Sequence, residues 1–310
     1  MLVPALRSVL FKIDRTEKAS ALARNALGVL RAFASAFSIK AGEVELGIAP
    51  MTGTADSGNL EADLPELLLA VARAAKVADR PVALFADEIQ YLKADDLSAL
   101  IVSDHKIGQQ GLPFIVFGAG LPMVAALAGD AKSYAERLFD YPDVGALDQA
   151  AAESAIRTPL SREGVAIEDD ALALIVEKTQ GYPYFLQEWG FHSWNSAVRS
   201  PITLVDVGNA THTAVKSLDK SFFRVRFDRL THGERDYMRA MASLGPGPHR
   251  SGDVAEALGI KTTSAAPTRS GLIKKGMLFS PQYGDTAFTV PMFDDFMRRS
   301  MPNWKRSAAE

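Results

Sequence analysis

Apolar residues recur every three or four positions over residues 17–37 and again over 60–77, which predicts two helices in the first part of the chain. Between them, residues 38–48 alternate apolar and polar side chains and predict a small hairpin. Residues 52–59 are rich in Gly, Ser and Asp, which is typical of a loop. By its pattern, the chain begins with helices around a short β segment.

Two short apolar runs follow, and both have the character of buried strands. Residues 80–88 are apolar and end in two acids, as expected of a buried parallel strand. A helical pattern covers 95–106, and the second apolar run, 112–117, ends in Gly-Ala-Gly. Strand, helix and strand in this order predict a βαβ unit. A third short strand is expected near 144–147.

From residue 148 to about 220 the pattern is helical throughout. Asp148 and Asp169 are the predicted N-caps of two of these helices. Gly181 and Pro183 are expected to end one helix and begin the next. The region therefore predicts a helical domain.

The pattern changes again near residue 231. Thr231 and Ser251 are predicted helix caps, and the Gly-Pro-Gly-Pro sequence between them is a break. Three helices and a hairpin in this order predict a winged helix-turn-helix. The predicted helices cover 231–244, 253–258 and 263–275, the strands cover 277–280 and 286–290, and a last helix begins at Met292.

Composition places the chain among ordinary globular proteins. Its 310 residues are 47% hydrophobic and 23% charged, enough for about two domains. The absence of cysteine excludes disulfides and thiolate metal sites. No apolar run is long enough to span a bilayer, and Arg7, Lys12 and Arg15 interrupt the start. We therefore expect a soluble, cytoplasmic protein with no membrane partner.

Charge is unevenly distributed along the chain. Residues 221–310 hold 14 basic and 9 acidic residues, a net charge of +5, whereas the remainder carries −8. An acidic body with a basic C-terminal part favours a second function that faces a polyanion. Chance asymmetry is the alternative.

The acidic pair Asp87-Glu88 carries the strongest local signal for chemistry. Carboxylates at the carboxyl end of a buried parallel strand lie where open α/β sheets bind ligands. In P-loop NTPases the first acid helps to hold Mg²⁺, and the second can act as general base toward the attacking water. The alternative is a strand that simply exits into solvent, and the pattern leaves both interpretations open.

The usual phosphate-binding motif is missing. No G-x-x-x-x-G-K-[ST] sequence occurs, and the glycines at 118–120 are too few for a dinucleotide loop. Without the loop, the sequence supplies no nest of backbone N–H groups and no lysine to bind phosphates.

Five segments together support a resemblance to a known family. The chain resembles bacterial AAA+ ATPases similar to the archaeal-type origin-recognition/initiator ATPases and to the signal-transducing STAND ATPases, with a C-terminal winged helix. The resemblance covers about residues 3–299, and it implies a partial P-loop α/β core (1–147), a helical lid (148–220) and a winged helix domain (221–310). The segments are PVALFADEIQYL, GLPFIVFGAGLP, SYAERLFDYPDVGALD, TQGYPYFLQEWG and SFFRVRFDRLTHGERDYMRAMASLGPGPHRSGDVAEALG.

The resemblance also implies roles for single residues, with ATP and Mg²⁺ as cofactors. Asp87 matches the Mg²⁺-binding acid and Glu88 the catalytic base. Arg137 is a candidate catalytic arginine finger, and a surface arginine on a helix is an equally good interpretation. The positions that match nucleotide-binding segments are Asp87, Glu88, Gly118, Gly120, Gly181, Tyr182 and Pro183.

Two departures from the family pattern matter. The segment at 181–187 lacks the expected arginine, and the first strand, phosphate loop, helix and second strand of the family precede the point where this chain starts. A reading frame assigned too late and a true loss both account for this. The missing strand would leave an apolar sheet edge exposed, so we expect weak ATP binding or none.

The predicted winged helix has the polar face that nucleic-acid binding requires. Ala265, Leu272 and Ile273 are expected to pack inward. Basic residues would contact phosphates, and Thr268 and Arg269 could reach base edges. A winged helix used for protein contacts is the alternative. The candidate DNA-binding residues are Arg250, Lys261, Thr262, Thr263, Thr268, Arg269, Lys274 and Lys275.

Two functional hypotheses remain open from the sequence. In the first, the chain belongs to an ATP-dependent switch that acts on DNA. In the second, it is a non-catalytic DNA-binding or adaptor protein that retains a degenerate ATPase fold. Association with copies of itself or with another protein is left open by both, and so is ATP hydrolysis.

Overall fold

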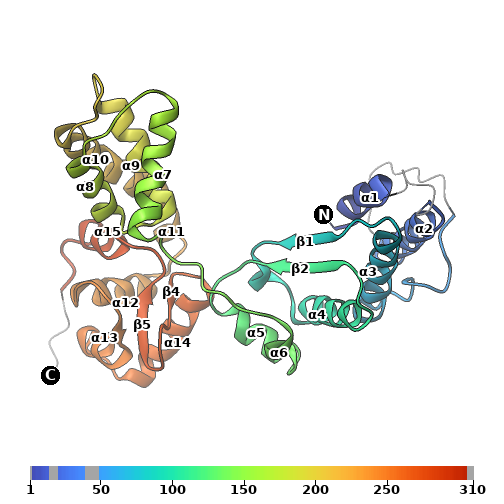
Figure 1. The fold of residues 1–310 in the computed structure, drawn as a ribbon. Coiled ribbons are helices and arrows are strands. Elements are labelled where there is room, and N and C mark those ends of the chain that lie inside the picture. The colour runs from blue at the N-terminus through green and yellow to red at the C-terminus, as the bar shows by residue number, and fades with distance from the viewer. Residues whose placement is uncertain (1, 14–19, 39–48, 306–310) are drawn as a thin grey trace. The chain divides into compact units, whose positions relative to one another are not determined.

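The computed structural model describes residues 2–13, 20–38 and 49–305. The chain divides into two compact units, Met1–Asp143 and Val144–Glu310, and it is mostly helical, with few strands (Figure 1). Apart from Ser38, the hairpin predicted for 38–48 lies outside the described residues. The finer boundaries predicted at 147 and 220 stay predictions.

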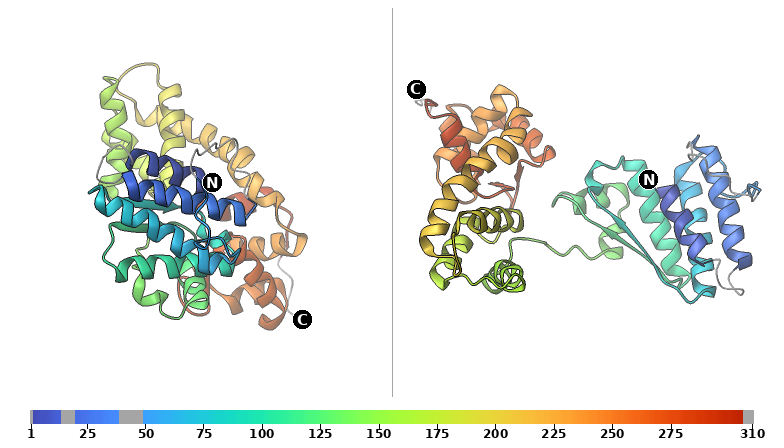
Figure 2. Two further views of the ribbon diagram at one scale, coloured as in Figure 1. Left: turned by 90° about the vertical axis from the view of Figure 1, so that its right-hand side faces the viewer. Right: turned by 90° about the horizontal axis from the view of Figure 1, so that it is seen from above.

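The first unit packs a layer of helices against one face of a small sheet (Figures 1 and 2). The predicted helices over 17–37 and 60–77 correspond to α2 and α3. Its core is built from leucines and alanines of α1, α2 and α3, which pack with Val82 and Phe114 of the strands. The elements are α1 (Leu2–Ile13), α2 (Ser20–Ala36), α3 (Leu60–Val77), β1 (Val82–Ala86), α4 (Ala94–Gln109), β2 (Phe114–Gly118), α5 (Val124–Ala131) and α6 (Ala135–Leu138).

The predicted βαβ unit is present. Strands β1 and β2 pair in parallel, in a register that runs from Val82 opposite Phe114 to Ala86 opposite Gly118, and α4 connects them. Because the two strands are parallel, their carboxyl ends lie at the same edge of the sheet. Because side chains alternate across a strand, one face of the sheet turns toward the helices and the other away from them.

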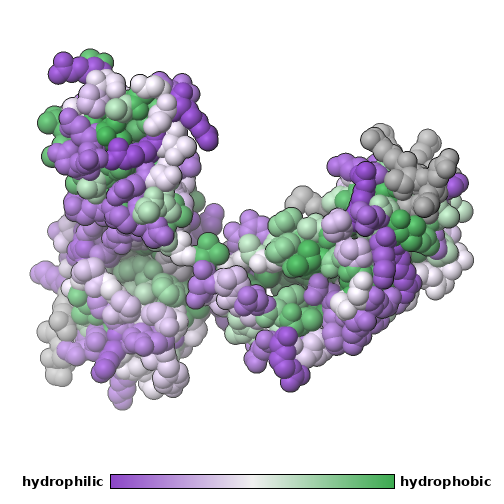
Figure 3. All heavy atoms as spheres, in the orientation of Figure 1, coloured by the Kyte–Doolittle hydropathy of each residue, from purple (hydrophilic) through white to green (hydrophobic). Residues whose placement is uncertain are grey.

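The outer face of this sheet is apolar and exposed. Phe85 is 76% exposed, Ile115 51% and Phe117 46%. The rings of Phe85 and Phe117 stack with their centroids 4.9 Å apart. Figure 3 shows apolar surface in this region. Parallel sheets normally have both faces covered, so this face is unusual.

The strand predicted near 144–147 is wrong. Residues 144–147 form no strand, and Val144 is 96% exposed. A short apolar run becomes a strand only where a neighbouring strand accepts its hydrogen bonds, and the segment has instead one backbone bond, from the N–H of Leu147 to the carbonyl of Gly181 (2.9 Å).

The first part of the second unit is helical, as predicted. Asp148 caps the first helix, accepting a hydrogen bond from the N–H of Ala151 at 2.8 Å. The predicted cap Asp169 is wrong by one residue, because Glu168 occupies the N-cap position and the Asp169 carboxylate pairs with Arg157. The elements are α7 (Gln149–Arg162), α8 (Asp169–Thr179), α9 (Pro183–Ser196), α10 (Leu204–Leu218), a π-helical turn (Asp219–Phe223) and α11 (Arg224–Asp228).

The C-terminal part contains the predicted three helices and hairpin. Thr231 and Glu234 form a reciprocal capping box at the start of α12. The predicted cap Ser251 is instead the first helical residue, and its hydroxyl donates to the carbonyl of Gly284 at 2.8 Å. The winged-helix assignment itself stays a prediction. The elements are α12 (His232–Ser243), β3 (His249–Arg250), α13 (Ser251–Leu258), α14 (Thr262–Lys274), β4 (Leu278–Phe279), β5 (Asp285–Phe288) and α15 (Phe293–Ser300), with antiparallel strand order β3-β5-β4.

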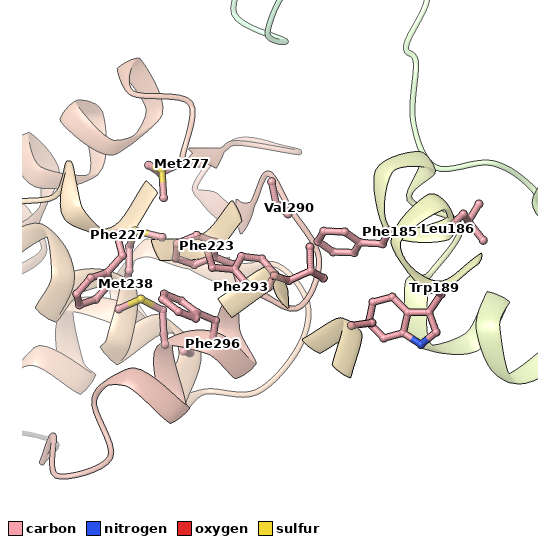
Figure 4. Packing of buried hydrophobic residues seen from close by; sticks show 14 of the residues in the cluster. Phe185, Leu186, Trp189, Phe223, Phe227, Met238, Met277, Val290, Phe293 and Phe296 are labelled. Carbon is pink, nitrogen blue, oxygen red and sulfur yellow. The ribbon is translucent and has the colours of Figure 1, made fainter. Parts of the chain in front are cut away.

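A single apolar core runs through the second unit. Aromatic rings from α9, from the π-helical turn and from α15 pack edge to face or stacked, as Figure 4 shows. Phe223 lies at the centre, with ring centroids 5.7 Å from Phe185, 5.5 Å from Phe293 and 5.3 Å from Phe296. The helical part and the C-terminal part therefore share their core.

Among the described residues, no helix combines the length and the apolar character that crossing a bilayer requires.

Gly181 lies at a close backbone contact that we expect to be essential for the second unit. Its φ is +69°, and an added Cβ would lie 2.3 Å from the carbonyl oxygen of Leu147. Gly181→Ala should lower the free energy of unfolding by more than about 2 kcal/mol, measured by urea denaturation. Gly208→Ala is the control: nothing lies within 4 Å of its added Cβ, and alanine should be neutral or stabilise the helix by about 0.5–1 kcal/mol. Equal effects of the two changes would contradict the role of this contact.

Candidate functional site

The acidic pair lies directly after β1, at the carboxyl end of the parallel sheet. Asp87 and Glu88 are both exposed. Glu88 has a left-handed backbone conformation (φ 56°, ψ 38°), which reverses the chain into a short 3₁₀ turn, Ile89–Tyr91. The Asp87 carboxylate accepts the N–H of Glu88 at 2.8 Å, and the side-chain amide of Gln90 donates to the Glu88 carboxylate. The turn therefore holds both carboxylates at the end of the strand.

The loop after β2 is bound to this turn. The N–H of Ile89 donates to the carbonyl of Ala119 at 3.0 Å, and the N–H of Ala119 donates to Ala86 at 2.8 Å. The amide oxygen of Gln90 accepts the N–H of Leu121 at 3.2 Å. Gln90 thus connects Glu88 to the second strand end, a role that our sequence analysis missed. Its position two residues after the acidic pair was the available signal.

Gly118 and Gly120 are explained by this contact. A Cβ at Gly118 would lie 2.7 Å from Cδ1 of Ile89, and one at Gly120 would lie 2.5 Å from the amide oxygen of Gln90. Both glycines allow the turn and the loop to approach closely. The structure therefore brings the acidic pair together with both glycines, and it gives the glycines a packing role.

The donor set at the acidic pair fits only part of a magnesium site. Carboxylate oxygens are suitable Mg²⁺ ligands, and Mg²⁺ sites usually complete their coordination with water and substrate phosphates. Within the described ranges, no group of three or more His, Asp or Glu side chains could hold a metal. Asp87 and Glu88 could supply at most two ligands from this chain.

The remaining predicted nucleotide-site residues lie elsewhere. Arg137 is exposed on α6, a helix of four residues in the first unit. Gly181, Tyr182 and Pro183 belong to the second unit, where they form the break between α8 and α9. Pro183 is the first residue of α9, and Tyr182 is its N-cap.

The inward face of α14 is as predicted, since Ala265 and Leu272 are buried and Ile273 is partly buried. The predicted DNA-binding residues divide into those whose side chains are exposed and unbonded and those, Arg269 and Lys275, that are bonded within the protein. Thr268 is half-buried. The exposed residues that form no hydrogen bond or ion pair within the described part of the chain through their side chains are Arg250, Lys261, Thr262, Thr263 and Lys274.

Arg269 is used inside the protein. Its Nε donates to the hydroxyl of Thr286 at 2.7 Å. Its Nη2 donates to the hydroxyl of Ser280 at 2.9 Å and to the carbonyl of Asp285 at 2.8 Å. These bonds tie α14 to the hairpin of β4 and β5. Two of its three guanidinium nitrogens, Nε and Nη2, are thereby engaged within the fold, and the contact of Arg269 with a base edge stays a prediction.

Lys275 is likewise engaged, with the capping box of α12. Its Nζ lies 2.7 Å from the carboxylate of Glu234 and 3.3 Å from the carbonyl of Arg229. Burial raises the pKa of the Glu234 carboxyl, but hydrogen bonds from Lys275 and Thr231 outweigh burial, so the net pKa is below the ordinary value of 4.5. Lys275 therefore stabilises the fold, and its charge is partly neutralised.

Comparison with known proteins identifies a fold and no function. A family model described as a domain of unknown function (DUF8462) matches residues 220–297, and none of the curated proteins matches the chain. The fold is similar to that of a Walker-type ATPase of Pyrococcus abyssi, with a TM-score of 0.57 and 15% identity over 86% of this chain and 75% of that one. The RuvB Holliday junction branch migration motor of Thermotoga maritima is less similar, with a TM-score of 0.40 and 16% identity over 72% of this chain and 80% of that one. The chain therefore shares the fold of a Walker-type ATPase.

The ion pair of Glu234 with Lys275 predicts a pH-dependent stability. Because the folded pKa lies below 4.5, the ionised carboxylate stabilises the native state above pH 4.5. That contribution is lost as the pH falls from 4.5 through the folded pKa. Glu234→Gln should cost about 1–2 kcal/mol at pH 7, and the difference from the unchanged protein should shrink below pH 4.5.

Urea denaturation at several pH values measures this difference. The exposed Glu163, changed to Gln, is the control and should alter the free energy of unfolding by less than about 0.5 kcal/mol. A loss at Glu234 that is constant from pH 7 to pH 3.5 would contradict the ion-pair explanation.

Proposed function

We propose that this protein is an AAA+/STAND-type nucleotide-dependent switch whose C-terminal winged helix binds DNA. The observation that carries the proposal is the parallel βαβ unit that ends in Asp87 and Glu88, with the Walker-type fold around it. Such a switch works in the cytoplasm, and the absence of cysteine fits that reducing compartment.

The acidic pair supplies the chemistry of this switch. Asp87 would hold Mg²⁺ directly or through a water molecule, and the metal would neutralise phosphate charge when bound. Glu88 would accept a proton from the attacking water. Its bond from Gln90 holds the carboxylate at the strand end, so its orientation is set before any ligand arrives. Arg137 is exposed on the four-residue helix α6, which suits contact with a neighbouring copy of the chain.

The chain by itself lacks the surface that normally binds the phosphates. Its sequence has no G-x-x-x-x-G-K-[ST] motif. The apolar face of Phe85, Ile115 and Phe117 is also left open by the described residues. We infer that a switch of this type needs a further strand and phosphate loop against this sheet. ATP hydrolysis by this chain alone should therefore be negligible.

The C-terminal part supports DNA binding by its element order and its charge. Helix, strand, two helices and two strands follow one another as in a winged helix. Lys261 and Lys274 lie near opposite ends of α14, and Arg250 precedes α13, all three exposed. Such residues would neutralise DNA phosphates and supply sequence-independent affinity.

A second candidate function is that of a non-catalytic adaptor with a degenerate ATPase fold. The specific observation that favours it is the internal use of Arg269 and Lys275. Two basic residues, one on α14 and one directly after it, thereby serve the fold. In this reading the C-terminal part contacts protein.

Weak nucleotide binding is the first expected outcome. Isothermal titration of the chain with Mg·ATP should give a dissociation constant above about 10 μM. Asp87→Asn should leave this weak signal unchanged, because without a phosphate loop the acid adds little affinity. Sub-micromolar binding would contradict the inference that this chain lacks a phosphate-binding surface, and a loss with Asp87→Asn would show that the acid already binds metal-nucleotide in this chain.

DNA binding should depend on the exposed lysines. The double change Lys261→Ala with Lys274→Ala should reduce the slope of log affinity against log salt by about 2, or roughly 0.9 for each phosphate contact. Lys216→Ala, an exposed lysine of α10, is the control and should leave the slope unchanged. Fluorescence anisotropy with duplex DNA measures both. Absence of binding, or equal slopes for all variants, would favour the adaptor.

A further inference from the structure

One guanidinium of the second unit is packed against an aromatic ring, and no acid of the described residues pairs with it. Arg226 of α11 lies with its guanidinium carbon 3.7 Å from the centroid of the Phe222 ring. Its Nη1 donates to the carbonyl of Phe222 at 3.1 Å. The ring of Tyr184 stacks on Phe222, with centroids 5.0 Å apart and planes at 20°. The guanidinium is thus held in one place by an aromatic surface.

The charge of Arg226 is not balanced locally. In the described part of the chain, no carboxylate lies within ion-pair distance of it, whereas Arg224 pairs with Asp228 and Arg299 pairs with Asp219. Arg229 adds a second positive charge close by, and it too has no carboxylate partner among these residues. Burial and then the charge of Arg229 lower the pKa of Arg226, although the tyrosines oppose them. A half-buried cation of this kind is costly unless an anion neutralises it.

Free donors remain at this cation. Nε and Nη2 of Arg226 have no acceptor among the described residues and are not enclosed. The ring of Tyr182 belongs to the same aromatic cluster, since its centroid lies 4.8 Å from that of Phe185, which lies 5.5 Å from that of Phe222. Glu188, one turn after Tyr184 on α9, lies 3.6 Å from His192 of the same helix. The cluster therefore offers donors and positive charge together.

We propose that Arg226, Arg229 and Tyr182 form a binding site for a phosphate group in the second unit. A guanidinium presents two parallel N–H donors that match two phosphate oxygens, and stacking on Phe222 orients it before binding. Arg229 adds charge, and the Tyr182 hydroxyl can donate to a third oxygen. The phosphate comes from a nucleotide or from a nucleic-acid backbone. The site itself does not depend on the proposed function, which bears only on this choice.

Arg235 provides a matched control within the same protein. Its guanidinium carbon lies 4.3 Å from the Phe227 ring centroid, and its Nε donates to the carbonyl of Phe227 at 3.3 Å. It thus makes the same two packing interactions as Arg226. No tyrosine faces it in the described ring contacts or hydrogen bonds. If Arg226 only packs, the two arginines should behave alike.

The test is isothermal titration of the full chain with sodium tripolyphosphate, without Mg²⁺ and at constant ionic strength. Arg226→Gln should weaken binding by at least about tenfold, because charged hydrogen bonds to the phosphate are lost. Arg235→Gln should change the affinity for tripolyphosphate by less than about twofold. It should lower the melting temperature by about as much as Arg226→Gln does. Equal weakening by both variants, or no binding by the unchanged protein, would overturn the proposal.

A second variant covers the case in which Arg226→Gln does not fold. Arg229 is exposed, so Arg229→Gln should fold normally and still weaken tripolyphosphate binding, by about threefold or more. Circular dichroism checks the fold. Unchanged binding by a folded Arg229→Gln variant would remove Arg229 from the site and count against the proposal.

Displacement of tripolyphosphate identifies the source of the phosphate. Competition by ATP that is lost in Arg226→Gln supports a nucleotide, and competition by duplex DNA that is lost supports a nucleic-acid backbone. Because tripolyphosphate contains neither a base nor a sugar, failure of this assay is separate from weak ATP binding or absent DNA binding by the chain. Competition by neither, despite tripolyphosphate binding, would overturn the assignment to these two sources.

Discussion

The candidate nucleotide site depends on one close approach, that of the turn after β1 to the loop after β2. Gly118 and Gly120 make it possible, because an added Cβ at either would lie within 2.7 Å of atoms of Ile89 or Gln90. Given that proximity, Gln90 can bond both to Glu88 and to Leu121. The acidic pair is therefore positioned by packing and by neutral hydrogen bonds. Among the described residues neither carboxylate has an ion-pair partner, so each keeps an oxygen that can meet a ligand.

The sheet that carries this site has two strands among the described residues, β1 and β2. A two-stranded sheet is marginal by itself and needs a helix or further strands against it. Helices cover the face of Val82 and Phe114, whereas Phe85 and Phe117 only stack on one another across the open face. An additional strand and helix would bury this face. An added strand with a phosphate loop would thus both stabilise the first unit and supply the phosphate contacts that ATP binding is proposed to lack.

Basic residues of the second unit divide by what they contact. Arg269 and Lys275 hold the hairpin and a helix cap, and Arg298 pairs with two acids on its own helix. Lys261 and Lys274 point to solvent. Arg226 belongs to neither group: it is packed on a ring, and it has no counterion in the part of the chain that the structure describes. The net positive charge of this region therefore overstates how many basic side chains can contact a polyanion, since several of them are already bonded within the fold.

Local elements followed well from the sequence, because periodicity, caps and breakers act over a few neighbouring residues. The helices over 60–77 and 231–244, the cap at Asp148 and the break at Gly181 are examples, with errors of one residue at Asp169 and Ser251. The βαβ unit was predictable for the same reason. Contacts between distant residues were not: Arg269 meets Thr286 and Lys275 meets Glu234, and no spacing rule joins such positions. Residues 144–147 look like a strand, but no strand of the described residues lies beside them, and pairing needs a neighbour that only the folded chain can bring.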